Sequence, residues 1–373
     1  MPFDVTSPAT TRHGIRRPSM RAVALWLFGV CGMLLVMVSL GGATRLTGSG
    51  LSIMEWAPLM GALPPLSDAE WQRLFGLYQK IPQYALVNQG FGLAGFKHIF
   101  WLEWSHRLWG RLIGLAFLVP LIWFAARGVI DRRLARRLGL LFLLGGLQGG
   151  IGWFMVASGF AADSTAVSPY RLVIHLAMAL TLYAAILWTA LSLWREGSEQ
   201  SSPANETSPG LRLLTVGTCG LVGLTILAGG FVAGLRAGLT YNTFPLMDGS
   251  LVPEGYAQLH PFIRNLTENV AAVQFDHRLL ATTTAVLALV TVVVGLRLGV
   301  TGRLRAALLA LGATVAGQYA LGVTTLLWVV PAGLGTAHQA MAVLVLTAAL
   351  AVLHAQVGVT AANRGEKKWP VPL

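Results

Sequence analysis

The sequence predicts an all-α integral membrane protein with eight transmembrane helices, and three observations support this fold class. The chain of 373 residues is 55% hydrophobic and only 11% charged, whereas soluble domains carry about 25% charged residues. Its mean hydropathy is +0.64. Apolar runs recur along the chain and the charged residues collect between them. Too little polar surface remains to surround a globule in water.

Eight apolar runs have the length of a membrane-spanning helix, which is about 20 residues. The first run follows a polar, basic segment and is longer than the core of a cleavable signal, so we expect it to be retained. The predicted spans are 22–42, 104–126, 138–157, 170–194, 212–233, 271–296, 304–330 and 337–358.

The basic residues predict the orientation of these spans. Arginines and lysines gather before the first span, after the last one, and around the connections that follow spans two, four and six. Cytoplasmic connections of membrane proteins carry an excess of these residues. We therefore expect a multi-pass protein of the cell inner membrane with both termini in the cytoplasm. Two long loops, 43–103 and 234–270, then lie on the outer side.

The first outer loop contains a predicted amphipathic helix. Ser67 and Glu70 have the spacing of a capping box, and the apolar residues that follow recur with a helical period. We expect this helix to lie on the outer membrane surface.

The net charge of +12 does not indicate a nucleic-acid partner, because the basic residues lie between apolar runs and not on one soluble face. The expected surroundings are membrane lipid. Cys31 and Cys219 both lie within apolar runs. They are expected to be free, buried thiols.

The two halves of the chain resemble each other. Cys-Gly at residues 31–32 precedes Gly-Gly by ten residues, and the same pattern recurs from residue 219; further similar stretches follow in the same order. A four-helix unit used twice has an even number of spans, so its copies face the same way about a pseudo-two-fold axis along the membrane normal. The predicted organisation is a cytoplasmic tail (1–21), a four-helix bundle (22–194), a cytoplasmic linker (195–210), a second four-helix bundle (211–358) and a cytoplasmic tail (359–373).

Four of the eight histidines occupy equivalent positions in the two halves. His106 corresponds to His277 and His175 to His338, and each stands at the outer start of a predicted span. Ionisable groups inside a bilayer are costly and usually functional. Two imidazoles facing each other in a four-helix bundle suit a haem iron held from both faces. The sequence lacks the carboxylate-rich set of two Glu-x-x-His motifs and further glutamates that a di-iron bundle uses, so it predicts one haem site in each half. The other histidines are expected to be surface or interface residues: His13, His98, His260 and His354.

Several arginines lie near the outer boundary of the spans, where positive residues are unusual. Guanidinium groups suit anionic haem propionates, although an arginine at the membrane interface can also extend toward the lipid headgroups. The candidate propionate partners are Arg45, Arg107, Arg171, Arg236 and Arg278.

One difference separates the halves. Glu103 lies one helical turn before His106, whereas the equivalent residue in the second half is Gln274. A carboxylate can take up a proton or stabilise positive charge as a C–H bond is oxidised. We therefore expect catalysis on a bound porphyrin in the first half, by Glu103, His106 and His175, and electron transfer in the second. The alternative is that Glu103 only pairs with Arg107 or Arg111.

In five stretches the sequence resembles the haem A synthase family, in its alphaproteobacterial and mitochondrial branch, which lacks the cysteine pair in the outer loops. The resemblance covers roughly residues 22–358. It rests on GGATRLTGSGLSIMEWAPLMGALPP from residue 41, EWSHRLWGRLIG from 103, AGLTYNTFPLMDG from 237, FDHRLLA from 275 and GTAHQAMA from 335.

The resemblance implies an oxidoreductase that acts on a CH group of haem O. Its methyl group becomes a formyl group by successive hydroxylations, which gives haem A for cytochrome oxidase. By the same resemblance His277 and His338 match the ligands of a resident haem b, His106 and His175 match the residues that hold the substrate haem, and Glu103 matches the catalytic carboxylate. The implied partners are haem O synthase (protohaem farnesyltransferase), an electron donor and further copies of the chain.

Two other functions remain open on the residues alone. A di-haem cytochrome b that only relays electrons from quinol would share the paired histidines, but it would not need a carboxylate in one half. A transporter built from parallel repeats would need a polar site at the membrane midplane, and the spans contain few charged residues there.

Overall fold

The computed structural model describes residues 20–58, 60–196 and 208–364, and it is almost entirely helical. The predicted tails at 1–21 and 359–373 and the linker at 195–210 lie largely outside these residues. Within them, eight helices are long and apolar enough to cross a membrane, as predicted. They are α1 (Met20–Leu46), α4 (Leu93–Ala126), α5 (Arg132–Ala157), α6 (Pro169–Glu196), α7 (Pro209–Gly234), α9 (Val270–Arg297), α10 (Gly302–Leu327) and α11 (Ala332–Arg364).

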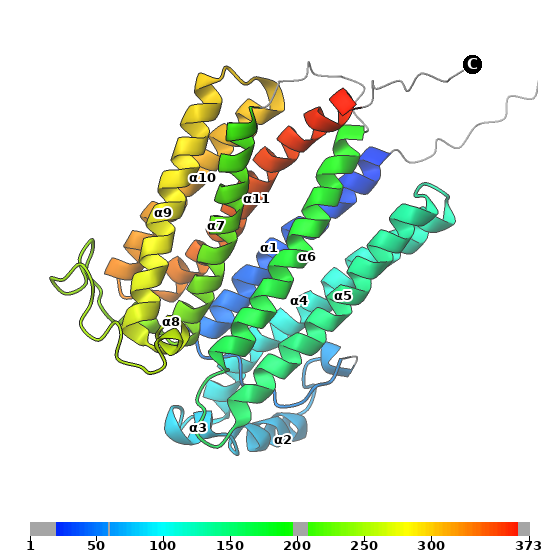
Figure 1. The fold of residues 1–373 in the computed structure, drawn as a ribbon. Helices are drawn as coiled ribbons and strands as arrows, with labels where there is room; N and C mark the ends of the chain where they lie inside the picture. Colours follow the sequence, from blue (N-terminus) through cyan, green and yellow to red (C-terminus); the bar gives the residue numbers. More distant parts are fainter. Residues whose placement is uncertain (1–19, 59, 197–207, 365–373) are drawn as a thin grey trace, which may run out of the picture.

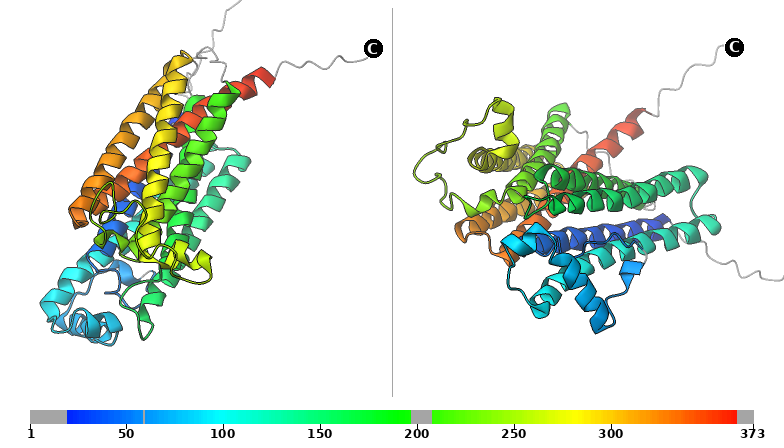
Figure 2. Two further views of the ribbon diagram at one scale, coloured as in Figure 1. Left: turned by 60° about the vertical axis from the view of Figure 1, so that its left-hand side comes forward. Right: turned by 90° about the horizontal axis from the view of Figure 1, so that it is seen from below.

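The long helices form two groups that lie side by side (Figures 1 and 2). In the first group α1 contacts α4, α4 contacts α5, α5 contacts α6, and α6 returns to α1; α7, α9, α10 and α11 close in the same way. The groups meet where α1 contacts α11 and where α6 contacts α7 and α11. Each group is therefore a four-helix ring, and the pseudo-two-fold axis between them stays a prediction.

The outward faces of the helices are apolar. On α4, Leu115, Val119 and Ile122 follow one another at helical spacing and are 57%, 61% and 58% exposed. A helix that is apolar on its outer as well as its inner face belongs in lipid. The free thiols also lie as predicted, with Cys31 buried and Cys219 half-buried.

The predicted second span, 104–126, lies within a longer helix, because α4 begins at Leu93. Its first turns bury Phe96, Ile99 and Phe100 against two short helices of the loop predicted to be the first outer loop, α2 (Asp68–Tyr78) and α3 (Pro82–Leu86). Polar residues between these positions lower the mean hydropathy of the segment, so its hydropathy alone does not reveal the apolar face. His106 is consequently in the fourth turn of its helix and not at its start.

Helix α2 packs on the protein through an aromatic cluster. Phe96 is fully buried, with its ring centroid 6.4 Å from that of Trp71 and 5.4 Å from those of Phe75 and Tyr78. At the N-terminus Ser67 accepts a hydrogen bond from the Glu70 amide at 3.2 Å, as the capping box predicts. The Glu70 carboxylate does not complete the box; it binds Arg73, which lowers its pKa.

The second outer loop is shorter and mostly irregular. It contains two single turns of 3-10 helix, η3 (Ala237–Leu239) and η4 (Phe262–Arg264), and one turn of α-helix, α8 (Asn265–Glu268). The first outer loop and the connection after α5 contain similar single turns, η1 (Met60–Ala62) and η2 (Ser158–Phe160). The halves thus differ mainly in what covers their outer ends.

The remaining histidines have ordinary environments. His98 and His260 are exposed, as expected. His354 is a buried interface residue: its Nε2 lies 3.1 Å from the Ser192 hydroxyl and its ring meets that of Trp188 edge-on. His13 lies outside the described residues.

We predict that Phe96→Ala loosens the outer-loop helices, because removing a buried phenylalanine costs about 3–5 kcal/mol. Limited proteolysis of the membrane-embedded protein should cut segment 47–92 faster than in the unaltered chain. Leu86→Ala is the control, since Leu86 is 68% exposed. Equal cleavage rates in the two variants would contradict the packing role of Phe96.

Candidate functional site

The four repeat-equivalent histidines lie on helices that are diagonal in their rings. His106 is on α4 and His175 on α6, and both helices contact α1 and α5. His277 on α9 and His338 on α11 are placed in the same way between α7 and α10. His106 and His175 lie close enough for the charge of one imidazole to act on the other, and so do His277 and His338. The structure therefore brings the histidines together in the predicted pairs.

Each imidazole packs against a glycine of a neighbouring helix. A β-carbon added at Gly41 would lie 3.1 Å from Cε1 of His106, and one at Gly152 would lie 3.0 Å from Cε1 of His175. The second half repeats these contacts. A β-carbon at Gly229 would lie 3.1 Å from the His277 ring, and one at Gly322 would lie 2.8 Å from the His338 ring. A β-carbon at Gly322 would require the His338 ring to move, and at the other three positions it would make an unusually tight contact with the ring.

The adjacent glycines serve the boundary between the halves. Gly42 on α1 meets the side chain of Gln339 on α11, and Gly230 on α7 meets Val173 and Leu176 on α6. In each Gly-Gly pair, one glycine thus contacts a histidine of its own half, and the other contacts a helix of the opposite half. This explains why both residues of the repeated pair are glycine.

Two imidazoles in each half suit a haem iron by residue type. The Nδ1 atoms of His106, His277 and His338 are buried without a well-formed hydrogen bond, although His277 interacts weakly with the backbone of Thr225. Buried polar atoms are rarely left unpaired, so each such atom needs an explanation. Among the described residues, no three His, Cys, Asp or Glu side chains gather around one point. Two imidazoles per bundle suit an iron whose other ligands come from a porphyrin.

Glu103 is buried and fully hydrogen-bonded. Its Oε2 accepts from the Ser52 amide and hydroxyl, both at 2.7 Å, and from the Ile53 amide at 2.9 Å. Its Oε1 accepts from Arg107 at 2.6 and 3.1 Å. Arg107 also donates to the carbonyls of Ile53 and Glu55. The carboxylate and the guanidinium together fasten the outer loop to α4, one turn before His106.

The second half contains the same fastening with an amide. Gln274 donates to the carbonyl of Ala237 at 2.6 Å and accepts from Arg278 at 2.8 Å. Arg278 donates to the carbonyls of Tyr241 and Thr243. The loop offers carbonyls to Gln274 but amides and a hydroxyl to Glu103. The difference between Glu and Gln therefore matches the polarity of the loop that each residue holds.

The other candidate arginines are placed differently. Arg45 reaches from α1 to the carbonyls of Ala233 and Gly234 at the end of α7, which joins the two halves. Arg171 donates to the carbonyl of Phe154 at 2.8 Å and lies over its ring. Arg236 is exposed. Contacts with propionates stay a prediction for all five arginines.

The sequence reasoning missed Gln148 on α5. Its Nε2 lies 2.9 Å from the carbonyl of His175 and 3.1 Å from Nδ1 of the same residue. The equivalent residue on α10, Gln318, has a buried and unpaired Oε1. The signal was present, because both glutamines lie in the repeated stretches that begin at residues 147 and 317.

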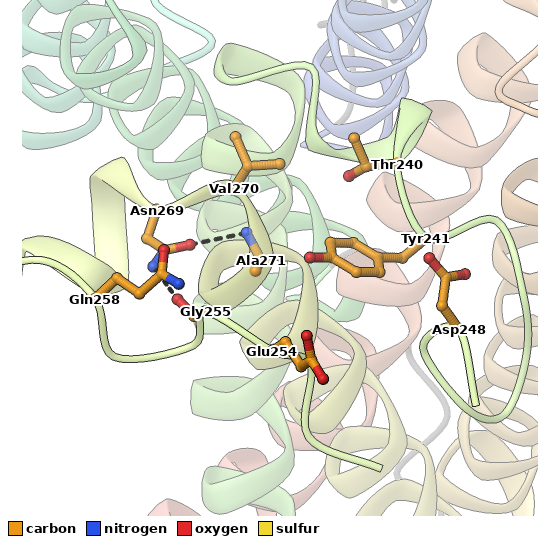
Figure 3. Close-up of a pocket in the computed structure, with 9 residues that line it drawn as sticks. All are labelled: Thr240, Tyr241, Asp248, Glu254, Gly255, Gln258, Asn269, Val270 and Ala271. Carbon is orange, nitrogen blue, oxygen red and sulfur yellow. Dashed lines mark hydrogen bonds between the residues drawn. The ribbon is translucent and has the colours of Figure 1, made fainter. Parts of the chain in front are cut away.

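A separate polar cavity of about 430 Å³ opens at the outer end of the second half. Tyr241, Asp248 and Glu254 from the loop face Asn269 and the start of α9 around it (Figure 3). A second hollow lies on the apolar face of α9 that points away from the bundle, along Val286–Arg297. None of the four paired histidines lines either cavity.

Fold and site together define a class of multi-pass membrane protein in which two four-helix rings each hold a pair of half-buried imidazoles. Comparison with known proteins narrows this class. A family model described as cytochrome oxidase assembly protein matches residues 24–350. The chain is 64% identical over 332 residues to the haem A synthase of Granulibacter bethesdensis, covering 89% of this chain and 86% of that protein. It is 47% identical over 354 residues to the haem A synthase of Nitrosospira multiformis, covering 95% and 99%. The chain belongs to the haem A synthase family.

We predict that Gly152→Ala and Gly229→Ala disturb the facing imidazoles, because overpacking a tight contact typically costs about 1–3 kcal/mol. Haem retained per protein should fall, and the electron paramagnetic resonance signal of low-spin haem should shift. The matched controls are Gly149→Ala on α5 and Gly220→Ala on α7, where an added β-carbon meets no atom within 4 Å. Equal spectra in all four variants would rule out this steric role.

Proposed function

We propose that this chain is a haem A synthase, which oxidises a methyl group of haem O to a formyl group and so supplies haem A to cytochrome oxidase. The observation that carries the proposal is the similarity to haem A synthases along nearly the whole chain. The stretch matched by the family model, 24–350, includes both histidine pairs.

The two halves divide the work in this proposal. His277 and His338 hold a resident haem b, which supplies one-electron transfer chemistry when bound. His106 and His175 hold haem O as the substrate. The glycines opposite the four rings fix the directions in which the imidazoles point. The apolar helices around them exclude water, which strengthens every electrostatic interaction inside the bundle.

Glu103 is the proposed catalytic carboxylate. Its position one turn before His106 places it on the side of the bundle where the outer loop covers the first half. The Glu103 carboxylate is the acceptor in all five of its hydrogen bonds. A carboxylate, which only accepts, therefore suits this position. There it can stabilise positive charge that develops as the methyl group is oxidised, or take up a proton.

The alternative of a di-haem cytochrome b is not favoured. It accounts for the histidine pairs equally well, but it gives no reason for the extensive similarity to haem A synthases. The proposal includes the cell inner membrane as the location, with both termini in the cytoplasm. It also includes haem O synthase as the source of substrate, an electron donor, and self-association of the chain.

The first test is Glu103→Gln, produced together with a haem O synthase. We predict that both haems stay bound while haem O or its hydroxylated intermediate accumulates, because an amide can neither take up a proton nor supply negative charge. Haem extraction and chromatography measure this. Ser52→Ala is the control, since it removes one hydrogen bond to Glu103 and keeps the carboxylate. Normal haem A in Glu103→Gln, or equal losses in both variants, would contradict a catalytic role.

The second test is His277→Ala, which should abolish binding of the resident haem b, because one imidazole of its pair is gone. The measurement is the reduced-minus-oxidised spectrum of the purified protein. His354→Ala is the matched control, because that buried histidine lies between α11 and α6 and has its own partners. An unchanged low-spin spectrum in His277→Ala would refute the ligand assignment.

A further inference from the structure

The loop between α1 and α4 contains an apolar stretch that takes no part in the histidine sites. Residues 57–66, APLMGALPPL, have no charged or polar side chain. Met60, Leu63 and Leu66 are 79%, 66% and 82% exposed, and the preceding Trp56 is 57% exposed. Exposed apolar patches mark contacts with another protein or with a membrane. The position of this stretch beside the helices indicates which of the two it contacts.

The stretch runs along the side of α4, away from the N-terminus of that helix. Arg107 donates to the carbonyl of Glu55 at 2.9 Å. One turn further along α4, Arg111 donates to the carbonyls of Ala57 and Pro58 at 2.7 and 2.8 Å. The following turn, η1, also contacts α4, and the chain then returns to α2, which packs on the first turns of α4. The loop therefore descends along the helix and comes back.

Two helices independently place this stretch at the depth of the hydrocarbon. About 22 Å of helix, at 1.5 Å per residue, separates Arg111 from Ala126, the last residue of α4. On α5, Trp153 stacks on Trp56 with ring centroids 6.2 Å apart. About 22 Å of helix also separates Trp153 from Leu138, which follows the basic first turns of α5. The hydrocarbon core of a bilayer is about 30 Å thick, so both contacts lie within it.

The backbone of the stretch suits surroundings without water. Backbone polar groups at this depth must find partners within the protein. The Gly61 amide donates to the Ala57 carbonyl at 3.0 Å, and the Leu63 amide donates to the Met60 carbonyl at 3.3 Å. Three of the residues 57–66 are prolines, which have no amide hydrogen to satisfy. Few donors of this loop therefore depend on water.

The second half contains a related sequence with a different exposure. Pro-Leu-Met occurs at residues 58–60 and again at residues 245–247. Met60 is 79% exposed, whereas Met247 is buried. The polar sequence Asp-Gly-Ser follows Met247, but the apolar sequence Gly-Ala-Leu follows Met60. The exposed apolar stretch is thus a feature of the first half.

The helices of the two halves are also joined differently at this level. Thr282 on α9 stands at the position of Arg111, and its hydroxyl lies 3.0 Å from that of Tyr319 on α10. In the first half the residue at the position of Tyr319 is Gly149, where an added β-carbon meets no atom within 4 Å. There α4 and α5 are linked through the loop, by Arg111 and by Trp153. The loop thus makes a link that side chains make in the second half.

We infer that residues 56–58 and 60–66 form a re-entrant segment, which enters the bilayer beside α4 and α5 and contacts the acyl chains of the lipid. Its exposed side continues the apolar face of α4 that begins one turn after Arg111, at Leu115, and extends to Ile122. That face lies in lipid, so the segment beside it does too. Membrane entry of this segment is independent of the reaction at the histidines, and it goes beyond the proposed function.

The test measures membrane depth with spin labels on the full chain in phosphatidylcholine vesicles. Cys31 and Cys219 are first replaced by alanine, so that a single introduced cysteine carries the label. Electron paramagnetic resonance then compares two relaxing reagents: oxygen, which concentrates in lipid, and a nickel chelate, which stays in water. Circular dichroism reports whether each variant keeps its helices.

Labels at Met60→Cys and Leu63→Cys should be accessible to oxygen and protected from the nickel chelate, as should the label at Leu115→Cys on the lipid face of α4. Gln89→Cys, in the exposed loop before α4, is the aqueous control and should show the reverse. Nickel accessibility at residues 60 and 63 equal to that at residue 89 would overturn the inference. Protection from both reagents would also overturn it, because a second copy of the chain would then cover the segment.

Arg111→Leu tests the link that holds the segment against α4. Without its hydrogen bonds the segment should leave the bilayer more often. The nickel accessibility of the label at Leu63→Cys should then rise about tenfold, the effect of losing one hydrogen bond to a charged group. Arg127→Leu is the matched control, because this arginine lies at the other end of the same helix, over the ring of Trp123. An equal rise in both variants, or no rise in either, would contradict the anchoring by Arg111.

Discussion

The placement of four half-buried imidazoles inside two apolar helix rings is the constraint on which the rest of this structure depends. A buried polar group without a partner destabilises a protein, and more so in lipid, where no water can satisfy it. The rings occupy their positions because a glycine stands opposite each one: Gly41, Gly152, Gly229 and Gly322. The absence of a β-carbon at these four points lets a flat ring lie against a helix backbone.

The outer loops complete each bundle by using the same device with different chemistry. In each half, one residue stands a helical turn before the first histidine and binds an arginine four residues further along the chain than itself. The two side chains together hold the loop in front of that helix. In the first half the residue is Glu103 and the loop presents donors; in the second it is Gln274 and the loop presents carbonyls. The position one turn before His106 therefore holds a carboxylate, paired with Arg107, where the position before His277 holds a neutral amide. This asymmetry is consistent with chemistry in one half and electron transfer in the other.

The boundary between the halves is held by close helix contacts and a few hydrogen bonds. Gly42 and Gly230 let α11 and α6 approach the opposite ring closely, and Arg45 caps the end of α7 with two hydrogen bonds. Tyr183 and Thr347 add a hydroxyl pair between α6 and α11. Because the two four-helix rings are joined this closely, the two histidine pairs keep fixed relative positions. Fixed positions suit electron transfer between two haems, which the proposed function requires.

The sequence by itself determined the membrane class and the eight spans, and it predicted the pairing of His106 with His175 and of His277 with His338. Hydropathy depends only on local composition, and the repeat preserves position along the chain. Only the tertiary structure decided that α4 starts at Leu93, that Glu103 faces Ser52 and Arg107, and that Gln148 contacts His175 while Gln318 does not. These features depend on which side chains meet across helices and loops, and equal spacing in two halves does not fix how far a side chain turns. The glycines illustrate what each source provides. The repeat located them in the sequence, but only the packing revealed that each one makes room for an imidazole.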